Sequence, residues 1–242
     1  PATPSTPVPR KPNSTRSGRR EMTRVKVCGV TNEADLDAVD AAGADAVGAI
    51  CDVPVDTPRE ISREHARGLF AAAPPFLTTV LVTMPDSIDH ARDLAREVGP
   101  DVLQLHGEFA ADDLDSLRAT GVRVVPVVDA TDLDRARAVA PVVDAVLVDT
   151  PSASGAGGTG ETHDWDASRE LVEAVDVPVV LAGGLSPDNV AEAVRTVEPD
   201  GVDVASGVEA SGGVKDHDAV RAFVAAAKAA RGESDDHEEA LA

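Results

Sequence analysis

Short apolar runs alternate with helix-like segments through most of the 242-residue chain, and this alternation is the strongest constraint on its fold. Each run is rich in Val, Ala, Leu or Ile and has the length of a buried strand. A helix-like segment follows each one. Eight such repeats predict a single-domain α/β fold, the (β/α)8 TIM barrel. The predicted strands are residues 24–30, 45–50, 77–83, 102–105, 122–128, 145–148, 178–181 and 201–204.

A doubly wound open sheet is the competing arrangement, because it is built from the same kind of repeat. Such a sheet usually has fewer strands, and one that binds a dinucleotide carries GxGxxG after its first strand. Here the first apolar run leads into Cys28-Gly29-Val30-Thr31, which does not match that pattern. The barrel is therefore the favoured fold.

Capping residues predict where several helices begin. Thr31, Ser62 and Asp86 are each placed to cap the helix that follows them. Ser186-Pro187 is expected to open the seventh helix, with proline in the first turn, where its missing N–H has no intrahelical partner to lose. The last helix is predicted over residues 216–230.

The two ends of the chain differ in composition from the body. Residues 1–21 are rich in Pro, Ser, Thr and Arg, so we predict a disordered basic segment, with a functional arm as the alternative. Residues 232–242 are acidic and are predicted to form a disordered tail. The barrel is expected to occupy residues 22–231, since Met22 directly precedes the first apolar run.

The net charge is −21 and the sequence pI is about 4.5. Binding to nucleic acid or to an anionic membrane surface requires a basic face, so neither is expected. The acidic excess is mostly Asp, and such a surface is soluble when salt screens its self-repulsion. The composition resembles that of a haloarchaeal cytoplasmic protein, and an acidic enzyme from a high-GC organism is the alternative. Lysine is nearly absent, occurring only at Lys11, Lys26, Lys215 and Lys228.

No apolar run approaches the roughly 20 residues of a membrane span, and residues 1–20 lack the apolar segment of a signal peptide. We therefore expect a cytoplasmic protein. Its two cysteines, Cys28 and Cys51, form no disulfide framework. Cys51 is interpreted as a packing residue, and an oxidative disulfide with Cys28 is the alternative. The histidines show no metal-like spacing, so no metal site is expected.

Residues capable of acid–base chemistry follow the predicted strands, where barrels place their active sites. Asp149 ends the sixth strand and leads into a glycine-rich loop, although an Asx-type turn is the plainer interpretation. Cys28 ends the first strand beside Lys26, where a thiolate is able to act as a base. An inert buried thiol is the alternative. A Cys28–Asp149 pair would suit an isomerisation that needs neither redox chemistry nor a metal.

Glycine turns near the end of the predicted barrel indicate a phosphate site. Gly183-Gly184 and Ser206-Gly207 follow the seventh and eighth strands, where backbone N–H groups commonly bind phosphate. Gly158, Thr159 and Gly160 are placed to close the same pocket from the sixth loop. The alternative is that these glycines only permit tight turns. The favoured ligand is therefore a small molecule that carries a phosphate group.

Three further side chains are candidates for the pocket. Arg59 follows the second strand and is either a fork-shaped donor for a substrate carboxylate or a surface residue paired with a neighbouring Asp. Gln104 and His106 lie at the end of the fourth strand and are expected to line the pocket.

Eight stretches of the chain match the phosphoribosylanthranilate isomerase family in sequence order, so the chain resembles this (β/α)8 family over nearly all of residues 24–230. The stretches are VKVCGVT at 25–31, GADAVG at 43–48, TPREIS at 57–62, LQLHGE at 103–108, VLVDT at 146–150, GGTGETHDW at 157–165, LAGGLSPDNV at 181–190 and GVDVASGVE at 201–209.

The resemblance implies conversion of N-(5-phosphoribosyl)anthranilate to 1-(2-carboxyphenylamino)-1-deoxyribulose 5-phosphate in tryptophan biosynthesis, without a cofactor. It implies that Cys28 is the general base at sugar C2 and that Asp149 is the general acid at the ring oxygen. It also implies that Arg59 holds the anthranilate carboxylate and that the glycine turns hold the phosphate. The partner that it implies is a small phosphosugar substrate. A monomer or a homodimer is expected.

The chain departs from the family pattern around the predicted aromatic pocket. Its second strand ends Ala49-Ile50-Cys51 where bulky aromatics are usual, and Pro126 stands near a frequent lysine position. The loop 52–60 also lacks the common lysine before its Pro-Arg. Two alternative functions stay open: a related barrel enzyme that also serves histidine biosynthesis, and a non-catalytic phosphate-binding barrel. An aspartate ending the first strand would have favoured the histidine-type reaction, and Cys28 stands there instead.

Overall fold

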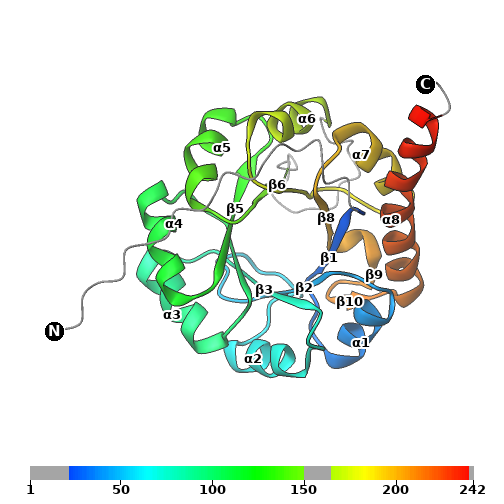
Figure 1. Ribbon diagram of the computed structural model, residues 1–242. Helices are drawn as coiled ribbons and strands as arrows, with labels where there is room; N and C mark the ends of the chain where they lie inside the picture. Colours follow the sequence, from blue (N-terminus) through cyan, green and yellow to red (C-terminus); the bar gives the residue numbers. More distant parts are fainter. Residues whose placement is uncertain (1–21, 150–164, 240–242) are drawn as a thin grey trace.

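The computed structural model describes residues 22–149 and 165–239, which form a closed barrel of eight parallel strands inside a ring of helices (Figure 1). Strand β1 pairs with both β2 and β8, and this pairing closes the sheet. The predicted TIM barrel is therefore confirmed, and the open sheet is excluded. The strands are β1 (Arg24–Cys28), β2 (Ala46–Ile50), β3 (Thr78–Thr83), β4 (Val102–Leu105), β5 (Arg123–Asp129), β6 (Val146–Asp149), β7 (Val179–Leu181) and β8 (Gly201–Val204).

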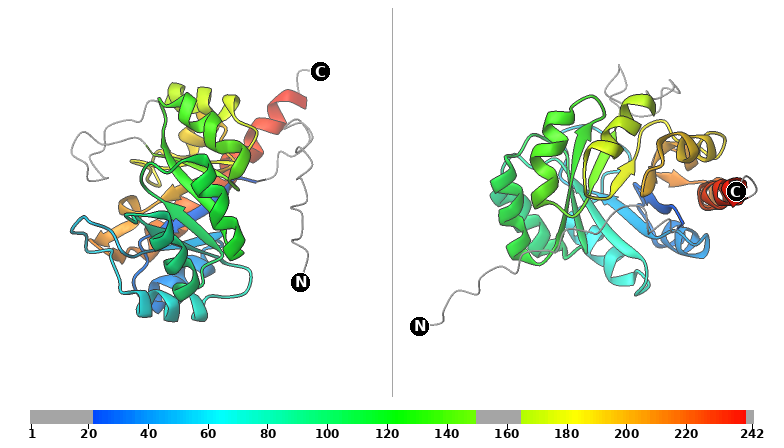
Figure 2. Two further views of the ribbon diagram at one scale, coloured as in Figure 1. Left: turned by 90° about the vertical axis from the view of Figure 1, so that its left-hand side faces the viewer. Right: turned by 45° about the horizontal axis from the view of Figure 1, so that its top comes forward.

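Helices cover the outside of the barrel in sequence order (Figure 2), and the described residues also include short 3₁₀ turns. In the described part of the chain, no helix combines the length and the apolar character needed to cross a membrane. The helices are α1 (Glu33–Ala41), α2 (Arg63–Ala72), α3 (Ile88–Val98), α4 (Ala111–Leu117), α5 (Leu133–Val139), α6 (Trp165–Ala174), α7 (Val190–Val197) and α8 (His217–Glu239), and the 3₁₀ turns are η2 (Arg118–Thr120), η3 (Ala140–Val142) and η4 (Ser206–Val208).

Two of the three predicted helix caps were wrong by one residue, and the third was correct. Ser62 caps α2 as predicted, accepting a hydrogen bond from the backbone N–H of the third helical residue. Helix α1 is capped by Asn32 rather than Thr31, and α3 by Ser87 rather than Asp86. In both cases two adjacent side chains are able to cap a helix. The backbone at Asn32 and Ser87 is extended, as a cap requires, and their side chains accept hydrogen bonds from Asp35 N–H and His90 N–H.

Two helix boundaries also differ from those predicted. Ser186-Pro187 lies in a turn before α7, because the Asn189 side chain accepts from Ser186 N–H at 2.8 Å and donates to the Gly184 carbonyl at 3.0 Å. Helix α8 runs through Gly232, where the acidic tail was predicted to begin, and ends at Glu239. A single glycine costs a helix about 1 kcal/mol, which is too little to end one by itself.

Successive side chains of β1 face opposite sides of the sheet and pack into two different apolar clusters. Val25 and Val27 belong to the large apolar cluster that packs against the helices. Cys28 belongs to a small cluster inside the barrel with Val80 and Val82 of β3. Because successive strand residues face opposite sides, Lys26 shares the inner side with Cys28. The barrel interior is thus polar beside the predicted base.

A two-stranded antiparallel sheet follows β8, formed by β9 (Glu209–Ser211) and β10 (Val214–Lys215). It projects from the same end of the barrel as the loop between β2 and α2 (Figure 2). The two segments touch, since a Cβ on Gly213 would lie 2.4 Å from the Pro58 carbonyl oxygen. We refer to residues 209–215 as the β9–β10 hairpin.

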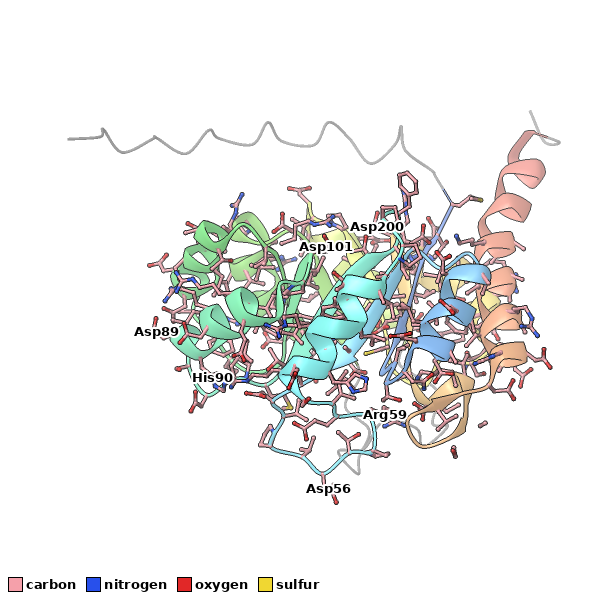
Figure 3. The ribbon with its side chains drawn as sticks, turned by 90° about the horizontal axis from the view of Figure 1, so that it is seen from below. Asp56, Arg59, Asp89, His90, Asp101 and Asp200 are labelled. Atoms are coloured by element: carbon pink, nitrogen blue, oxygen red, sulfur yellow. The ribbon has the colours of Figure 1, made fainter. Side chains whose placement is uncertain are left out.

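Four aspartates clamp the opposite end of the barrel. Each lies just before an even-numbered strand and accepts a hydrogen bond from a backbone N–H near the start of the preceding odd-numbered strand. Asp101 and Asp200 lie at the end of the barrel away from Asp56 and Arg59 (Figure 3). The amino-terminal end is therefore built for stability. The bonds join Asp45 to Val25 N–H (2.9 Å), Asp101 to Thr79 N–H (2.8 Å), Asp144 to Val124 N–H (2.9 Å) and Asp200 to Val179 N–H (2.9 Å).

Removal of one clamp should measurably destabilise the barrel. Asp101 also accepts from the Thr79 hydroxyl at 2.8 Å, and Thr79 is buried. Asp101→Ala leaves both donors without their acceptor, so we expect the free energy of unfolding to fall by about 1–3 kcal/mol. Urea denaturation in molar KCl measures this change. The exposed Asp37→Ala is the control and should stay within about 0.5 kcal/mol of the parent; equal losses in both variants would contradict the clamp.

Candidate active site

Cys28 is the last residue of β1, and its thiol is buried in the barrel interior. Its register partner on β2 is Gly48. A Cβ on Gly48 would lie 3.1 Å from both Cys28 Sγ and Lys26 Cε. These contacts show that the thiol and the lysine chain converge on Gly48, and that any larger residue would push against both.

A buried ion pair spans β1 and β8 next to this thiol. Lys26 Nζ lies 2.8 Å from Asp203 Oδ2, and both side chains are more than nine-tenths buried. The two residues are register partners, so the pair crosses the seam that closes the barrel. The second oxygen of Asp203, Oδ1, is buried and has no hydrogen-bond partner among the described residues. It offers an open acceptor in the barrel interior.

Three nearby charges act on the Cys28 thiol. Burial raises its pKa above the ordinary value, and the Lys26 ammonium opposes that rise. The Asp203 carboxylate raises the pKa further, whereas the Lys215 ammonium lowers it. Burial alone would lower the pKa of Lys26, but Asp203 and Cys28 raise it overall, so Lys26 stays charged. The free protein therefore holds mainly the thiol at neutral pH, and Lys26 favours its ionised form.

Asp149 ends β6 and is half-buried, in register with Asp129 at the end of β5. Parallel strands in a closed barrel bring their carboxyl ends to one rim, so Asp149 and Cys28 share that rim. The loop that follows Asp149 lies outside the described residues, and so do the predicted phosphate residues Gly158, Thr159 and Gly160.

Strand β4 contributes an uncharged polar pair to the interior. Gln104 is buried, and its Nε2 lies 3.4 Å from Nε2 of His106. Burial lowers the pKa of His106, and the nearby Lys26 charge lowers it further. The imidazole is therefore neutral at neutral pH and serves as a hydrogen-bonding group rather than a cation. The assignment of both residues to a substrate pocket stays a prediction.

Arg59 lies at the same end of the barrel as Asp56 (Figure 3), and an acid from a distant part of the chain holds its side chain. A Cβ on Gly29, directly after Cys28, would lie 2.8 Å from Arg59 Cδ. The Arg59 guanidinium donates to Glu209 through Nε at 2.8 Å and Nη2 at 2.7 Å. Lys215 Nζ contacts the same carboxylate at 2.9 Å. The alternative interpretation, which paired Arg59 with a neighbouring Asp, was wrong about the partner, because the acid is the distant Glu209.

The loops after β7 and β8 are in close backbone contact. Gly183 and Gly184 have φ of +88° and +63°, a backbone conformation that glycine adopts readily. Gly207 lies in η4, and a Cβ there would stand only 2.0 Å from the Leu185 carbonyl oxygen. The predicted Gly183-Gly184 and Ser206-Gly207 turns thus form one continuous surface at the rim. Phosphate binding by that surface stays a prediction.

The interpretation of Cys51 as a packing residue fits the structure. Both cysteines are free and buried. Cys51 belongs to the outer apolar cluster and Cys28 to the inner one, so the two thiols lie on different sides of the sheet. The Cys51 thiol donates to Asp52 at 3.4 Å, and burial first, then this bond, raises its pKa to about 12. This geometry does not favour a Cys28–Cys51 disulfide.

Sequence reasoning did not assign roles to Asp203, Glu209 or Lys215, and it treated Lys26 only as a neighbour of the base. One available signal was the rarity of lysine, because two of the four lysines in the chain, Lys26 and Lys215, are buried here. Within residues 22–149 and 165–239, no three His, Cys, Asp or Glu side chains are grouped to hold a metal ion.

The chain also matches known proteins over most of its length. A family model described as N-(5'phosphoribosyl)anthranilate (PRA) isomerase matches residues 25–226. The N-(5'-phosphoribosyl)anthranilate isomerase of Haloferax volcanii is 88% identical over 221 residues, which are 91% of this chain and 100% of the relative. The phosphoribosyl anthranilate isomerase of Thermotoga maritima superposes with a TM-score of 0.77 at 36% identity, covering 86% of this chain and 100% of that one.

A further solved phosphoribosyl anthranilate isomerase holds reduced 1-(o-carboxyphenylamino)-1-deoxyribulose 5-phosphate. It superposes with a TM-score of 0.74 at 34% identity, covering 86% of this chain and 100% of that one. The fold and the family match together define an isomerase of the (β/α)8 barrel class. The chain belongs to the N-(5'-phosphoribosyl)anthranilate isomerase family. The Haloferax relative also supports the halophilic interpretation of its acidic composition.

Neutralising Lys26 and neutralising Asp203 should shift the pKa of the Cys28 thiol in opposite directions. Lys26→Met removes the cation that lowers the pKa of Cys28 and leaves Asp203, which raises it, so the pKa of Cys28 should rise further. Asp203→Asn should lower it instead. The pH dependence of iodoacetamide alkylation, followed by peptide mass spectrometry at Cys28, measures both shifts. Shifts of the same sign in the two variants would refute this account of the thiol.

Proposed function

We propose that this chain converts N-(5'-phosphoribosyl)anthranilate to 1-(2-carboxyphenylamino)-1-deoxyribulose 5-phosphate, with Cys28 as general base and Asp149 as general acid. The observation that carries the proposal is a buried thiol beside a lysine and a carboxylate at the same barrel rim, in a chain of this family. The reaction is an isomerisation, so an acid and a base suffice and no oxidant is consumed.

In the proposed first step, Asp149 gives a proton to the ring oxygen of the furanose. The bond between that oxygen and C1 breaks, and the nitrogen lone pair forms a C=N bond, giving an open iminium ion. In the second step, the Cys28 thiolate removes the proton from C2, and the electron pair of that C–H bond neutralises the iminium. The resulting enol becomes the ketone when its hydroxyl proton is lost and C1 is protonated. Each placed acid or base typically contributes about 10²–10⁴-fold.

The thiolate is the basic form of Cys28, and the neighbouring Lys26 charge favours it although the pKa of Cys28 is raised overall. The iminium ion is positively charged, and its formation would further favour the thiolate. Since the thiolate fraction of the free enzyme increases until the pH exceeds the Cys28 pKa, kcat/KM is expected to rise with pH over that range.

The substrate carries two anionic groups, and the rim supplies a candidate site for each. We assign the anthranilate carboxylate to Arg59, which lies against Gly29, next to the base. We assign the phosphate to the joined turns at Gly183-Gly184 and Ser206-Gly207, because glycine turns after the seventh and eighth strands of such barrels commonly offer backbone N–H groups to phosphate. The Gly158–Gly160 stretch belongs to the same proposal on sequence grounds alone.

The acidic composition and the haloarchaeal relative support a protein that works in a salt-rich cytoplasm. All assays below are therefore set in molar KCl, where screening reduces the repulsion among surface carboxylates. We also propose a monomer or a homodimer, since a similar solved structure is of monomers generated from the dimeric isomerase of Thermotoga maritima.

The acid and the base are tested by the loss of turnover. Freshly made phosphoribosylanthranilate is fluorescent, and its decay reports the isomerisation. We expect Asp149→Asn and Cys28→Ser each to lower kcat by at least about 10²-fold. Asp129→Asn, which alters the register neighbour of Asp149 on β5, is the matched control and should keep kcat near the parent value. Full activity of Asp149→Asn, or equal losses in the control, would exclude Asp149 as the acid.

The phosphate surface is tested at its tightest contact. Gly207→Ala places a methyl group where the Leu185 carbonyl stands, so the two turns must separate. We expect KM for the substrate and Ki for inorganic phosphate to rise about tenfold or more, as for the loss of one charge-assisted hydrogen bond. Gly68→Ala on α2 meets nothing within 4 Å and is the control. An unchanged Ki for phosphate in Gly207→Ala would place the phosphate elsewhere.

A further inference from the structure

We infer that Glu209, itself held by Lys215, is a positioning residue that sets the Arg59 guanidinium for the substrate carboxylate. The inference rests on the proposed role of Arg59. It extends that role to a triad of Arg59, Glu209 and Lys215, drawn from the loop after β2 and from both strands of the β9–β10 hairpin.

The geometry of the triad fixes the plane of the guanidinium. Nε of Arg59 donates to Oε1 of Glu209 at 2.8 Å, and Nη2 donates to Oε2 at 2.7 Å. Such a two-point contact defines both the position and the orientation of a planar fork. Without it, Arg59 would be a long side chain on a loop that contains no helix or strand. Glu209 therefore restricts the rotamers of the Arg59 side chain before the substrate binds, so binding loses less side-chain entropy.

The carboxylate is itself locked in place. The Glu209 side chain is 4% exposed and that of Lys215 is 0% exposed, whereas Arg59 keeps 22%. Lys215 Nζ donates to Glu209 Oε1 at 2.9 Å and to the Ala205 carbonyl at 3.1 Å. Burial would raise the pKa of Glu209, but Arg59 and Lys215 lower it overall, so the carboxylate is ionised at neutral pH.

The hairpin that carries both residues is anchored to the barrel at separate points. The Thr31 hydroxyl donates to the Gly213 carbonyl at 2.9 Å, and Lys215 N–H donates to Asp35 Oδ2 at 3.0 Å. Gly213 also packs on the Pro58 carbonyl, one residue before Arg59. These contacts connect the hairpin to α1 and to the loop of Arg59. The hairpin is therefore a rigid support for the arginine.

The charges leave the triad attractive to an anion. Two cations and one carboxylate sum to +1, and Glu209 occupies only the Nε–Nη2 edge of the guanidinium. An arginine has five N–H donors, so the Nη1 edge keeps donors for a second carboxylate. Among the described residues, Nη1 of Arg59 forms no hydrogen bond. Arg59 is thus oriented by one carboxylate and still able to bind another.

The decisive experiment compares two ligands that differ only in the carboxyl group. The probes are reduced 1-(2-carboxyphenylamino)-1-deoxyribulose 5-phosphate and its phenylamino counterpart without the carboxyl group, with Kd measured by calorimetry in molar KCl. Glu209→Gln should weaken the carboxylated ligand about tenfold, equivalent to 1.4 kcal/mol, and leave the other ligand unchanged. Lys215→Met should act in the same direction. Ser211→Ala, an exposed change on β9, is the control and should alter neither Kd.

Kinetics and a double variant separate positioning from general damage. Because Arg59 binds the carboxylate in ground and transition states alike, Glu209→Gln should raise KM and leave kcat nearly unchanged. In an Arg59→Ala background, Glu209→Gln should add no further loss. Equal weakening of both ligands would mean that Glu209 only maintains the fold. Tighter binding of the carboxylated ligand would mean that Glu209 competes with substrate; either result overturns the inference.

The Arg59→Ala variant tests the proposed carboxylate site independently of the role inferred for Glu209. If Arg59→Ala does not discriminate between the two ligands, the carboxylate site proposed for Arg59 is wrong. If Arg59→Ala discriminates and Glu209→Gln does not, Arg59 keeps its role and the positioning role of Glu209 is wrong. Absence of turnover by the parent chain would refute the isomerase proposal while leaving both ligand comparisons interpretable.

Discussion

The Lys26–Asp203 ion pair is the interaction on which the fold and the site both depend. It bridges β1 and β8, the first and last strands of the barrel, whose pairing closes the sheet. It lies in the barrel interior beside the Cys28 thiol. Removing one partner from a buried pair is costly because the other charge is left without compensation. The pair therefore ties closure of the barrel to the electrostatic environment of the base. Gly48 makes the arrangement possible, since it leaves room for the thiol and the lysine chain together.

Charged groups are distributed unevenly between the two ends of the barrel. At the amino-terminal end, carboxylates such as Asp101 accept backbone N–H groups and hold strands in register. At the carboxyl-terminal end, Lys26, Lys215 and Arg59 gather around two buried acids, and a phosphosugar with two anionic groups is proposed to bind there. In a chain with a net charge of −21, this concentration of cations at one rim gives an anionic substrate a local attraction that the overall surface does not offer.

The fold could be predicted almost completely from the sequence, because buried parallel strands appear as apolar runs and each run has a helix-like successor. Helix ends were less predictable: Thr31 and Asn32 are both able to cap, but Asn32 caps α1 and the Thr31 hydroxyl donates to the Gly213 carbonyl of the hairpin. Cys28 and Arg59 could be selected because they follow strands. Glu209 could not be assigned to Arg59, since 150 positions separate them and only the closed barrel brings the hairpin to the loop.

The aspartate clamps also divide the barrel in a regular way. Each one links an odd-numbered strand to the even-numbered strand that follows it, so the clamps join β1 to β2, β3 to β4, β5 to β6 and β7 to β8. The barrel is thus assembled from four units of similar construction, each with its own internal fastening. Chain breaks or circular permutations placed between units, for example after α4, would keep every fastening within one fragment. A break inside a unit would separate a carboxylate from the strand that it secures.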